Sequence, residues 1–287
     1  MKKTETHIVP KLFAPIRLQE YGVGIFDVAL TKSALKKALK KRYIKVNDVV
    51  ATSATFINGG ERISLSISEE ISLKKKLILQ LKVLFEDDHL AVIHKPAGIL
   101  VSGNSFKTIT NALVRNIKRS TLPDATKPQP VHRLDFGTTG VLLVGKTSSS
   151  IRALNKLFED KDIKKTYYAT AIGEMDSEGE ITTNIDGKAS KSNYTLCKTV
   201  LSKRFGTLNL LRLEPQTGRR HQLRKHLSHI DHPILGDKVY GVEPLILNGK
   251  GLYLHAYSLQ FTHPFTHEQL FLKEELPERF KKIFDSL

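Results

Sequence analysis

The sequence predicts an α+β protein whose larger domain is built on a mixed or antiparallel sheet. Along residues 83–272, apolar segments of strand length mostly follow one another directly, and only scattered segments have helical periodicity. We find no internal repeat and no glycine-rich loop of the kind that cradles phosphate. The 287 residues are enough for one large domain of ~200 residues and a small one.

Composition favours a polyanionic partner. The chain has 45 Lys+Arg against 29 Asp+Glu, a formal charge of +16, which points to nucleic acid. No apolar run reaches ~18 residues, and the N-terminus MKKTETHIVP lacks the apolar core of a signal peptide. We therefore expect a cytoplasmic protein without a membrane site. The single cysteine, Cys197, excludes an internal disulfide, and we expect it to pack within a strand.

The first quarter of the chain is strongly basic. Residues 1–14 resemble a short basic arm, and residues 31–42 have the apolar spacing of a helix with Thr31 as its N-cap. Residues 1–76 hold 15 Lys+Arg and 7 Asp+Glu, a net +8 that is half of the whole excess. Because like charges on one helix repel, a helix of this kind favours phosphate binding. The cations that we expect to contact RNA are Lys36, Lys37, Lys40, Lys41 and Arg42.

Residues 15–68 are similar to the S4-type RNA-binding module. A basic helix leads into KKRYIKVNDVV, with strands expected at 43–50 around a turn, and then into NGGERISLSI, with a strand at 63–67. Asp48 stands where that family usually has glycine, and Glu61 replaces its usual aspartate. The alternative is a structural α/β subdomain that does not bind RNA. Residues 69–82 are expected to link it to a second domain, 83–287.

The second domain is predicted to contain most of the strands. A rigid bend is expected at Lys95-Pro96 with Gly98, between two strands, and the proline-containing residues 127–130 lead into the central stretch. Residues 233–241 form a loop. Helices are expected at 108–118, 148–163, 221–230 and from 277, and strands at 83–85, 90–93, 141–144, 164–173, 179–185, 193–201, 207–213, 252–261 and 268–272.

The stretch VHRLDFGTTGVLLVGK, residues 131–146, places Arg133 and Asp135 in a loop before a buried strand. An isolated Arg-x-Asp is more often a solvated surface pair. A carboxylate in this setting can also act as a nucleophile at carbon, an electrostatic stabiliser or a metal ligand. Ordinary glycoside hydrolysis requires a second carboxylate, so a single acid better suits a base that leaves and is recaptured at the same sugar.

The histidines near the end of the chain raise the question of a metal. His221, His226, His229 and His232 fall on or after one predicted helix, but only His226 and His229 share a face of it. We therefore expect no metal site and assign these histidines to packing, capping or RNA contact.

Five motifs, in order over residues 83–272, resemble the RluA-type pseudouridine synthases. They are EDDHLAVIHKPAG, HRLDFGTTG, KTYYATAIG, PQTGRRHQLRKH and PILGDKVYG. Two positions depart from the family pattern, where Thr139 replaces serine and His94 replaces asparagine. The resemblance implies the pseudouridine synthase fold and the isomerisation of uridine to pseudouridine in RNA, a reaction that needs no cofactor.

The resemblance also implies roles for individual residues. Asp135 falls on the catalytic aspartate, and Arg224 on the arginine that pairs with it, which we expect to do so through two hydrogen bonds. Arg133 falls on the residue that fills the place of the flipped uridine. Tyr167, rather than Tyr168, falls on the tyrosine that stacks on the base and helps to remove the proton from its carbon 5. Further substrate contacts are expected from Thr138, Thr139, Arg219 and His221.

Two other functions remain open from the sequence. One is a non-catalytic RNA-binding protein on the same fold, and the other is a glycosylase that releases uracil. The substrate is RNA, with ribosomal RNA favoured over transfer RNA. No residue identifies the target uridine, and we expect a monomer.

Overall fold

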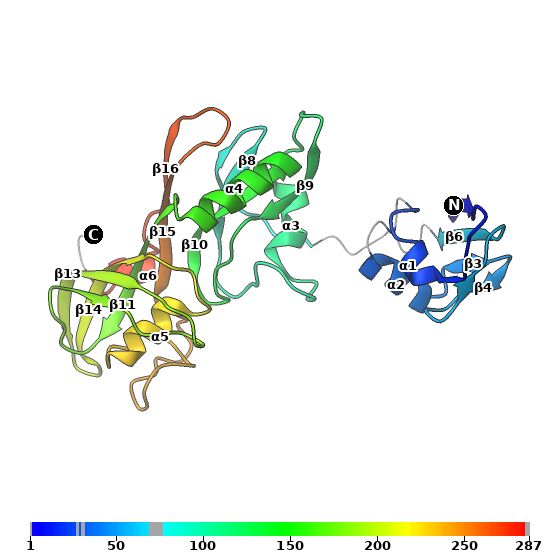
Figure 1. The fold of residues 1–287 in the computed structure, drawn as a ribbon. Helices are drawn as coiled ribbons and strands as arrows, with labels where there is room; N and C mark the ends of the chain where they lie inside the picture. Colours follow the sequence, from blue (N-terminus) through cyan, green and yellow to red (C-terminus); the bar gives the residue numbers. More distant parts are fainter. Residues whose placement is uncertain (1, 27–28, 30–31, 69–76, 285–287) are drawn as a thin grey trace. The chain divides into compact units, whose positions relative to one another are not determined.

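The computed structural model describes residues 2–26, 29, 32–68 and 77–284, and the chain divides into two compact units, Met1–Lys76 and Leu77–Leu287 (Figure 1). Residues 69–76 of the predicted linker lie outside the described residues. Its last part belongs to the second unit, because Leu81 is buried in that core and its N–H donates to Oδ1 of Asn116 at 2.8 Å. In the described part, no helix has the length and apolar character needed to span a membrane.

The first unit contains a four-stranded antiparallel sheet in the order β1 (Lys2–Ile8), β6 (Arg62–Ser68), β3 (Ile44–Val46) and β4 (Val49–Val50). The predicted basic arm is therefore wrong, because β1 pairs with β6 along its whole length. β1 is an edge strand, and residues 4–8 are all at least partly exposed. An edge strand held by backbone hydrogen bonds lacks the apolar alternation by which a strand is recognised.

Two short helices and a second strand pair complete the first unit. β2 (Ile16–Arg17) pairs with β5 (Phe56–Ile57), and α1 (Leu18–Tyr21) follows β2. The predicted helix is confirmed as α2 (Lys32–Lys40), which buries Leu35, Ala38 and Leu39. Thr31, its predicted N-cap, lies outside the described residues.

A tight hairpin joins β3 to β4. Asn47 and Asp48 both adopt positive φ, 46° and 68°, as a two-residue turn of the primed type requires. Arg62 stabilises this strained turn: its N–H donates to Oδ1 of Asn47, and its guanidinium to Oδ2 of Asp48 at 2.6 Å. These contacts explain how an aspartate is accommodated where glycine would be conformationally easier.

The second unit confirms the predicted α+β class with a mixed sheet. Its main path runs β12-β13-β14-β11-β15-β10-β8-β7, with β16 beside β15 and β9 beside β10. The pairs are antiparallel except β10–β15, which is parallel. The strands are β7 (Val83–Glu86), β8 (Leu90–Lys95), β9 (Ala125–Pro130), β10 (Thr139–Thr147), β11 (Lys164–Ile172), β12 (Glu178–Ile181), β13 (Ser192–Ser202), β14 (Gly206–Pro215), β15 (Leu254–Thr262) and β16 (Gln269–Lys273).

Helices cover both faces of β8 and β10, which explains their continuous apolar sequence. Leu142 and Val144 pack on one face with α3 (Ile109–Asn116), whereas Val141 and Leu143 pack on the other with Leu154 of α4 (Ser148–Asp160). A separate core forms around β11 and β14, where α5 (Gln222–His229) and α6 (Glu278–Lys281) pack (Figure 1).

Two local predictions are wrong, and one strand was not predicted. After the bend at Gly98 the chain forms only one bridge, from Leu100 to Thr108, rather than a second strand. Residues 125–130 form strand β9, because backbone pairing with β10 outweighs the prolines at this sheet edge. Cys197 is exposed, because a register shift between Leu196 and Lys198 leaves it unpaired with β14.

Candidate active site

A cavity of about 640 Å³ opens in the second unit beside the loop before β10, the start of β11 and the first turn of α5. It brings together predicted site residues that are up to 91 positions apart in the sequence, from Arg133 to Arg224 (224 − 133 = 91). The charged side chains among its described lining residues are six cations and two carboxylates: Arg133, Lys161, Lys165, Arg219, Arg220 and Arg224, with Asp135 and Glu159. Its charge therefore suits a polyanion.

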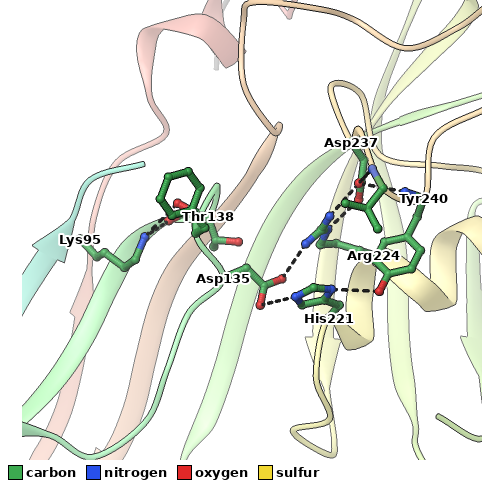
Figure 2. Close-up of polar contacts among 9 residues, drawn as sticks. Lys95, Asp135, Thr138, His221, Arg224, Asp237 and Tyr240 are labelled. Atoms are coloured by element: carbon green, nitrogen blue, oxygen red, sulfur yellow. Dashed lines mark hydrogen bonds and ion pairs between the residues drawn. The ribbon is translucent and has the colours of Figure 1, made fainter. Parts of the chain in front are cut away.

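Asp135 lies in a short loop whose backbone accepts hydrogen bonds from Lys95. The Thr138 N–H donates to the Asp135 carbonyl at 3.1 Å and closes the turn. The buried Nζ of Lys95 donates to the Thr138 carbonyl at 2.8 Å (Figure 2). It also donates to the carbonyls of Pro96 and Phe136 at 3.0 and 3.4 Å. Burial lowers the pKa of Lys95 to about 8, and the charge of Asp135 opposes that shift. Lys95 thus pairs the Thr138 carbonyl of the loop, whereas the Phe136 carbonyl also accepts from the Gly98 N–H at 2.8 Å.

The loop enters the sheet through Gly140. This residue has φ of +114°, and a Cβ there would lie 2.1 Å from the carbonyl oxygen of Ala256 on β15. Only glycine permits so close an approach, which brings Thr139 and Gly140 into the parallel pairing with β15. The position of Asp135 therefore depends on the pairing of two strands.

Arg224 on α5 connects Asp135 to a second carboxylate. Its Nη1 lies 3.4 Å from Oδ2 of Asp135, whereas Nε and Nη2 donate to Asp237 at 2.6 and 2.7 Å (Figure 2). The expected two-bond pairing with Asp135 is thus wrong: that geometry belongs to Asp237, whose side chain is fully buried. Burial alone would raise the pKa of Asp237, but hydrogen bonds from Arg224 and from the N–H groups of Val239 and Tyr240 lower it.

His221 faces the other oxygen of Asp135. Its Nε2 is 3.8 Å from Oδ1 of Asp135, and its Nδ1 hydrogen-bonds the Tyr240 hydroxyl at 2.9 Å. The Tyr240 ring also packs against the Arg224 guanidinium, 5.0 Å from its centroid. Burial lowers the pKa of His221, and the charge of Asp135 opposes this shift. Tyr240 therefore contacts both residues that flank Asp135.

Tyr167 on β11 lines the same cavity, whereas Tyr168 packs edge-on against Tyr257 at 5.1 Å. Burial raises the pKa of Tyr167, and the nearby charge of Asp135 raises it further. A phenol with a raised pKa is a poor base near neutral pH. The help of Tyr167 in proton removal remains a prediction, and its half-buried ring is available for stacking.

Arg133, Thr138 and Arg219 line the cavity, with Arg133 and Arg219 exposed, and their contacts with the substrate remain predictions. Thr139 does not line it: its buried hydroxyl hydrogen-bonds Nδ1 of His255 at 2.8 Å. That prediction is wrong because Thr139 already belongs to β10, where it pairs with β15. The five cations of the basic helix lie in the first unit, where all are exposed on or just after α2.

Three of the four histidines considered for a metal have separate polar partners, and the first of them, His221, contacts Tyr240. His226 is buried against Ser190 and Ser192, at 2.9 and 3.0 Å, and His232 contacts the Ile172 carbonyl at 3.2 Å. Among the residues that the structure describes, no group of three His, Cys, Asp or Glu side chains is placed to hold a metal ion.

Comparison with known proteins agrees with this geometry. Residues 89–229 match the family described as RNA pseudouridylate synthase. Ribosomal large subunit pseudouridine synthase C of Escherichia coli is 31% identical, over 99% of this chain and 98% of that protein. This chain belongs to the RNA pseudouridine synthase family. Pseudouridine synthase D of the ribosomal large subunit of Nitrosomonas europaea is 30% identical, over 97% of this chain and 86% of that protein.

A solved structure supports the same fold. Human RNA pseudouridylate synthase domain containing 4 is 27% identical, with a TM-score of 0.57 over 69% of this chain and 90% of that chain. The predicted family is confirmed, and the protein is an RNA pseudouridine synthase, an enzyme that isomerises uridine in RNA. This finding sets aside the non-catalytic RNA-binding protein and the uracil-releasing glycosylase.

Three residues of this pseudouridine synthase were not predicted as site residues: Lys95, Asp237 and Tyr240. Lys95 is the last residue of the largely apolar strand β8, an unusual place for a charge that could have marked it. Asp237 and Tyr240 stand in the motif PILGDKVYG, which contributed to the family resemblance but from which no site residue was named. Their polar side chains, in a loop that belongs to a family motif, were the signal that could have identified them as site residues.

Proposed function

We propose that this enzyme converts uridine to pseudouridine in ribosomal RNA, with Asp135 as the catalytic aspartate. The observation that carries the proposal is the placement of Asp135 in a cationic pocket, between Arg224 Nη1 at 3.4 Å and His221 Nε2 at 3.8 Å. Ribosomal RNA is favoured because similar proteins are named for the ribosomal large subunit. We expect the enzyme to act in the cytoplasm.

The reaction rearranges one nucleotide without a net change in its atoms. The bond between N1 of uracil and C1′ of ribose breaks, uracil stays in the pocket, and its C5 forms a new bond to C1′. C5 loses its proton and N1 gains one. Asp135 acts at this nucleotide as a nucleophile or a stabilising carboxylate at carbon. Arg224 orients it through one hydrogen bond, which leaves lone pairs of the carboxylate for the substrate.

Access to the glycosidic bond requires the uridine to leave its stack. Unstacking costs a few kcal/mol, and a side chain that fills the vacated space offsets part of that cost. Arg133 is exposed at the cavity and two residues from Asp135, so it suits this role. Tyr167 offers a flat ring on which the displaced base stacks. In the first unit, we propose that α2 belongs to an S4-like module and binds RNA phosphates through its exposed cations.

The test is pseudouridine mapping of total cellular RNA from cells with and without the gene, complemented by the native enzyme or by Asp135→Asn. We expect a ribosomal site that disappears in the deletion and returns only with the native enzyme. Full restoration by Asp135→Asn would remove Asp135 from the catalytic role. Loss of a site in transfer RNA instead would leave the chemistry standing and reject the ribosomal substrate.

A further inference from the structure

Lys165 is a partly buried cation in the active-site cavity. It lies on β11 and lines the cavity. In the described part of the chain, no carboxylate forms an ion pair with it and no acceptor takes a hydrogen bond from its Nζ. Burial lowers the pKa of Lys165, and the charge of Lys161 lowers it further. A desolvated ammonium group without a partner costs free energy, which a bound anion would recover.

Other buried lysines of the second unit have partners. Lys95 donates to three carbonyls, and Lys146 pairs with Oε1 of Glu86 at 2.8 Å. Even the exposed neighbour Lys164 lies 3.7 Å from Glu214. Lys165 differs from these lysines, because the described part of the protein supplies no anionic or carbonyl partner for it.

The surroundings of Lys165 add positive charge. Lys161 ends α4 with a left-handed φ of 67°, a conformation in which glycine would be easier, and it also lines the cavity. Its charge favours the last carbonyls of the helix, which accounts for a lysine there. His132 remains neutral, because burial and then the charge of Lys165 lower its pKa to about 3. Glu159, the nearby lining carboxylate, is exposed.

Lys165 and Tyr167 lie on the same strand, and both line the cavity although the pairing with β15 shifts register between Thr166 and Tyr167. We propose that Lys165, together with Lys161, binds a backbone phosphate next to the target uridine. This proposal rests on the proposed function, in which Tyr167 stacks on the target base. The ligand is a phosphodiester of the RNA strand, so the contact positions the substrate without reading its sequence.

The test compares Lys165→Gln with Lys164→Gln, its neighbour on the opposite face of β11, and with the charge-preserving Lys165→Arg. Each is placed in the Asp135→Asn background, and binding of a short oligouridylate is measured over a range of salt. Removal of one lysine–phosphate ion pair reduces the slope of log affinity against log salt by about 0.7. We expect this smaller slope for Lys165→Gln, together with about tenfold weaker binding at low salt. Lys164→Gln and Lys165→Arg should keep the native slope.

A second measurement locates the phosphate. In the substrate RNA found by mapping, one linkage beside the target uridine is replaced by an uncharged methylphosphonate. This replacement should weaken RNA binding by the Asp135→Asn enzyme. It should not weaken RNA binding further in the enzyme that also carries Lys165→Gln. An unchanged salt slope in Lys165→Gln, or an equal fall in Lys164→Gln, overturns the phosphate site. Because the oligouridylate measurement needs no turnover, that result is separate from a failure of the enzyme to make pseudouridine.

Discussion

At the scale of single residues, Arg224 divides its hydrogen bonds unequally between two carboxylates. Asp237 receives two short bonds and is fully buried, whereas Asp135 receives one long bond and is about a quarter exposed, 23% by side chain. Two parallel bonds fix the plane of the guanidinium, so Nη1 has one direction in which to donate. Asp237 therefore positions Arg224, and Arg224 in turn positions Asp135.

Asp237→Asn should impair both stability and catalysis. The change leaves the buried Arg224 charge with only the longer contact to Asp135, so we expect the free energy of unfolding to fall by about 3 kcal/mol. Misplacement of the guanidinium by ~1 Å should lower kcat by roughly 100-fold. Urea unfolding and single-turnover pseudouridine formation measure the two effects.

Asp186→Asn is the matched control. Asp186 forms a surface ion pair at 2.8 Å with Lys225, which directly follows Arg224 on α5. Exposed pairs contribute ~0–1 kcal/mol, and kcat should remain native. Equal kcat values for Asp237→Asn and Asp186→Asn would show that Asp237 has no positioning role.

At the scale of elements, the parallel pairing of β10 with β15 determines where the loop that carries Asp135 ends. Pairing extends over Thr139 and Gly140 opposite His255 and Ala256, and it directly follows the loop that carries Asp135. The two strands approach so closely at Gly140 that its missing Cβ is a structural requirement. The loop and the sheet are thus coupled through one glycine.

Gly140→Ala should disrupt this junction. The new methyl group would meet the backbone of Ala256 in a conformation that L residues rarely adopt, which we expect to cost about 4 kcal/mol of unfolding free energy. Chemical unfolding measures the loss.

Gly187→Ala separates conformational strain from steric clash. Gly187 also has positive φ, 73°, but a Cβ there meets nothing within 4 Å, so strain alone should cost ~1 kcal/mol. Similar losses in the two variants would contradict a requirement for close approach at Gly140.

At the scale of the whole molecule, buried histidines make stability depend on pH. Burial lowers the pKa of His132 to about 3 and that of His255 to about 4. In the unfolded chain both take up a proton below pH ~6.5, whereas in the folded chain they remain neutral until the lower pKa is reached. Stability is therefore present above pH ~6.5 and is lost progressively as the pH falls.

His132→Gln should reduce the loss of stability between pH 7 and pH 5 by ~2 kcal/mol relative to the native protein. Glutamine retains an acceptor for the Leu143 N–H, which His132 Nε2 accepts at 3.0 Å. Urea unfolding at both pH values gives the difference. The same loss in both proteins would mean that His132 is protonated in the folded state.

The division into two units predicts that RNA affinity and catalysis can be separated. Replacing Lys36, Lys37, Lys40, Lys41 and Arg42 with glutamine should reduce the salt slope of RNA binding by about 0.7 for each phosphate that the helix no longer binds. The value of kcat at saturating RNA should remain native, since the cavity lies in the second unit. Binding titrations and single-turnover rates measure the two quantities.

As a control, a variant with arginine at the four lysine positions keeps the positive charge, so the salt slope of its RNA binding should remain native. A native slope in the glutamine variant would assign α2 to a solvated surface instead of RNA binding.

The sequence by itself determined the fold class, the family and seven of the 22 residues that line the cavity. Strands such as 141–144 and the helix near residues 31–42 follow from periodicity, which is a local property of the chain. Asp135, Arg133 and Tyr167 lie in short motifs that a resemblance transfers directly. The N-terminal strand was missed because an edge strand held by backbone pairing has no apolar pattern.

The tertiary structure decided how these residues are connected. Asp237 lies 13 positions after Arg224, Phe136 lies 41 positions after Lys95, and His255 lies 116 positions after Thr139. Only folding brings such residues together, so the sequence could not show that Arg224 bonds mainly to Asp237 or that Thr139 faces away from the cavity. Local patterns specify which residue types are present, whereas the direction and partner of each side chain depend on contacts between distant segments.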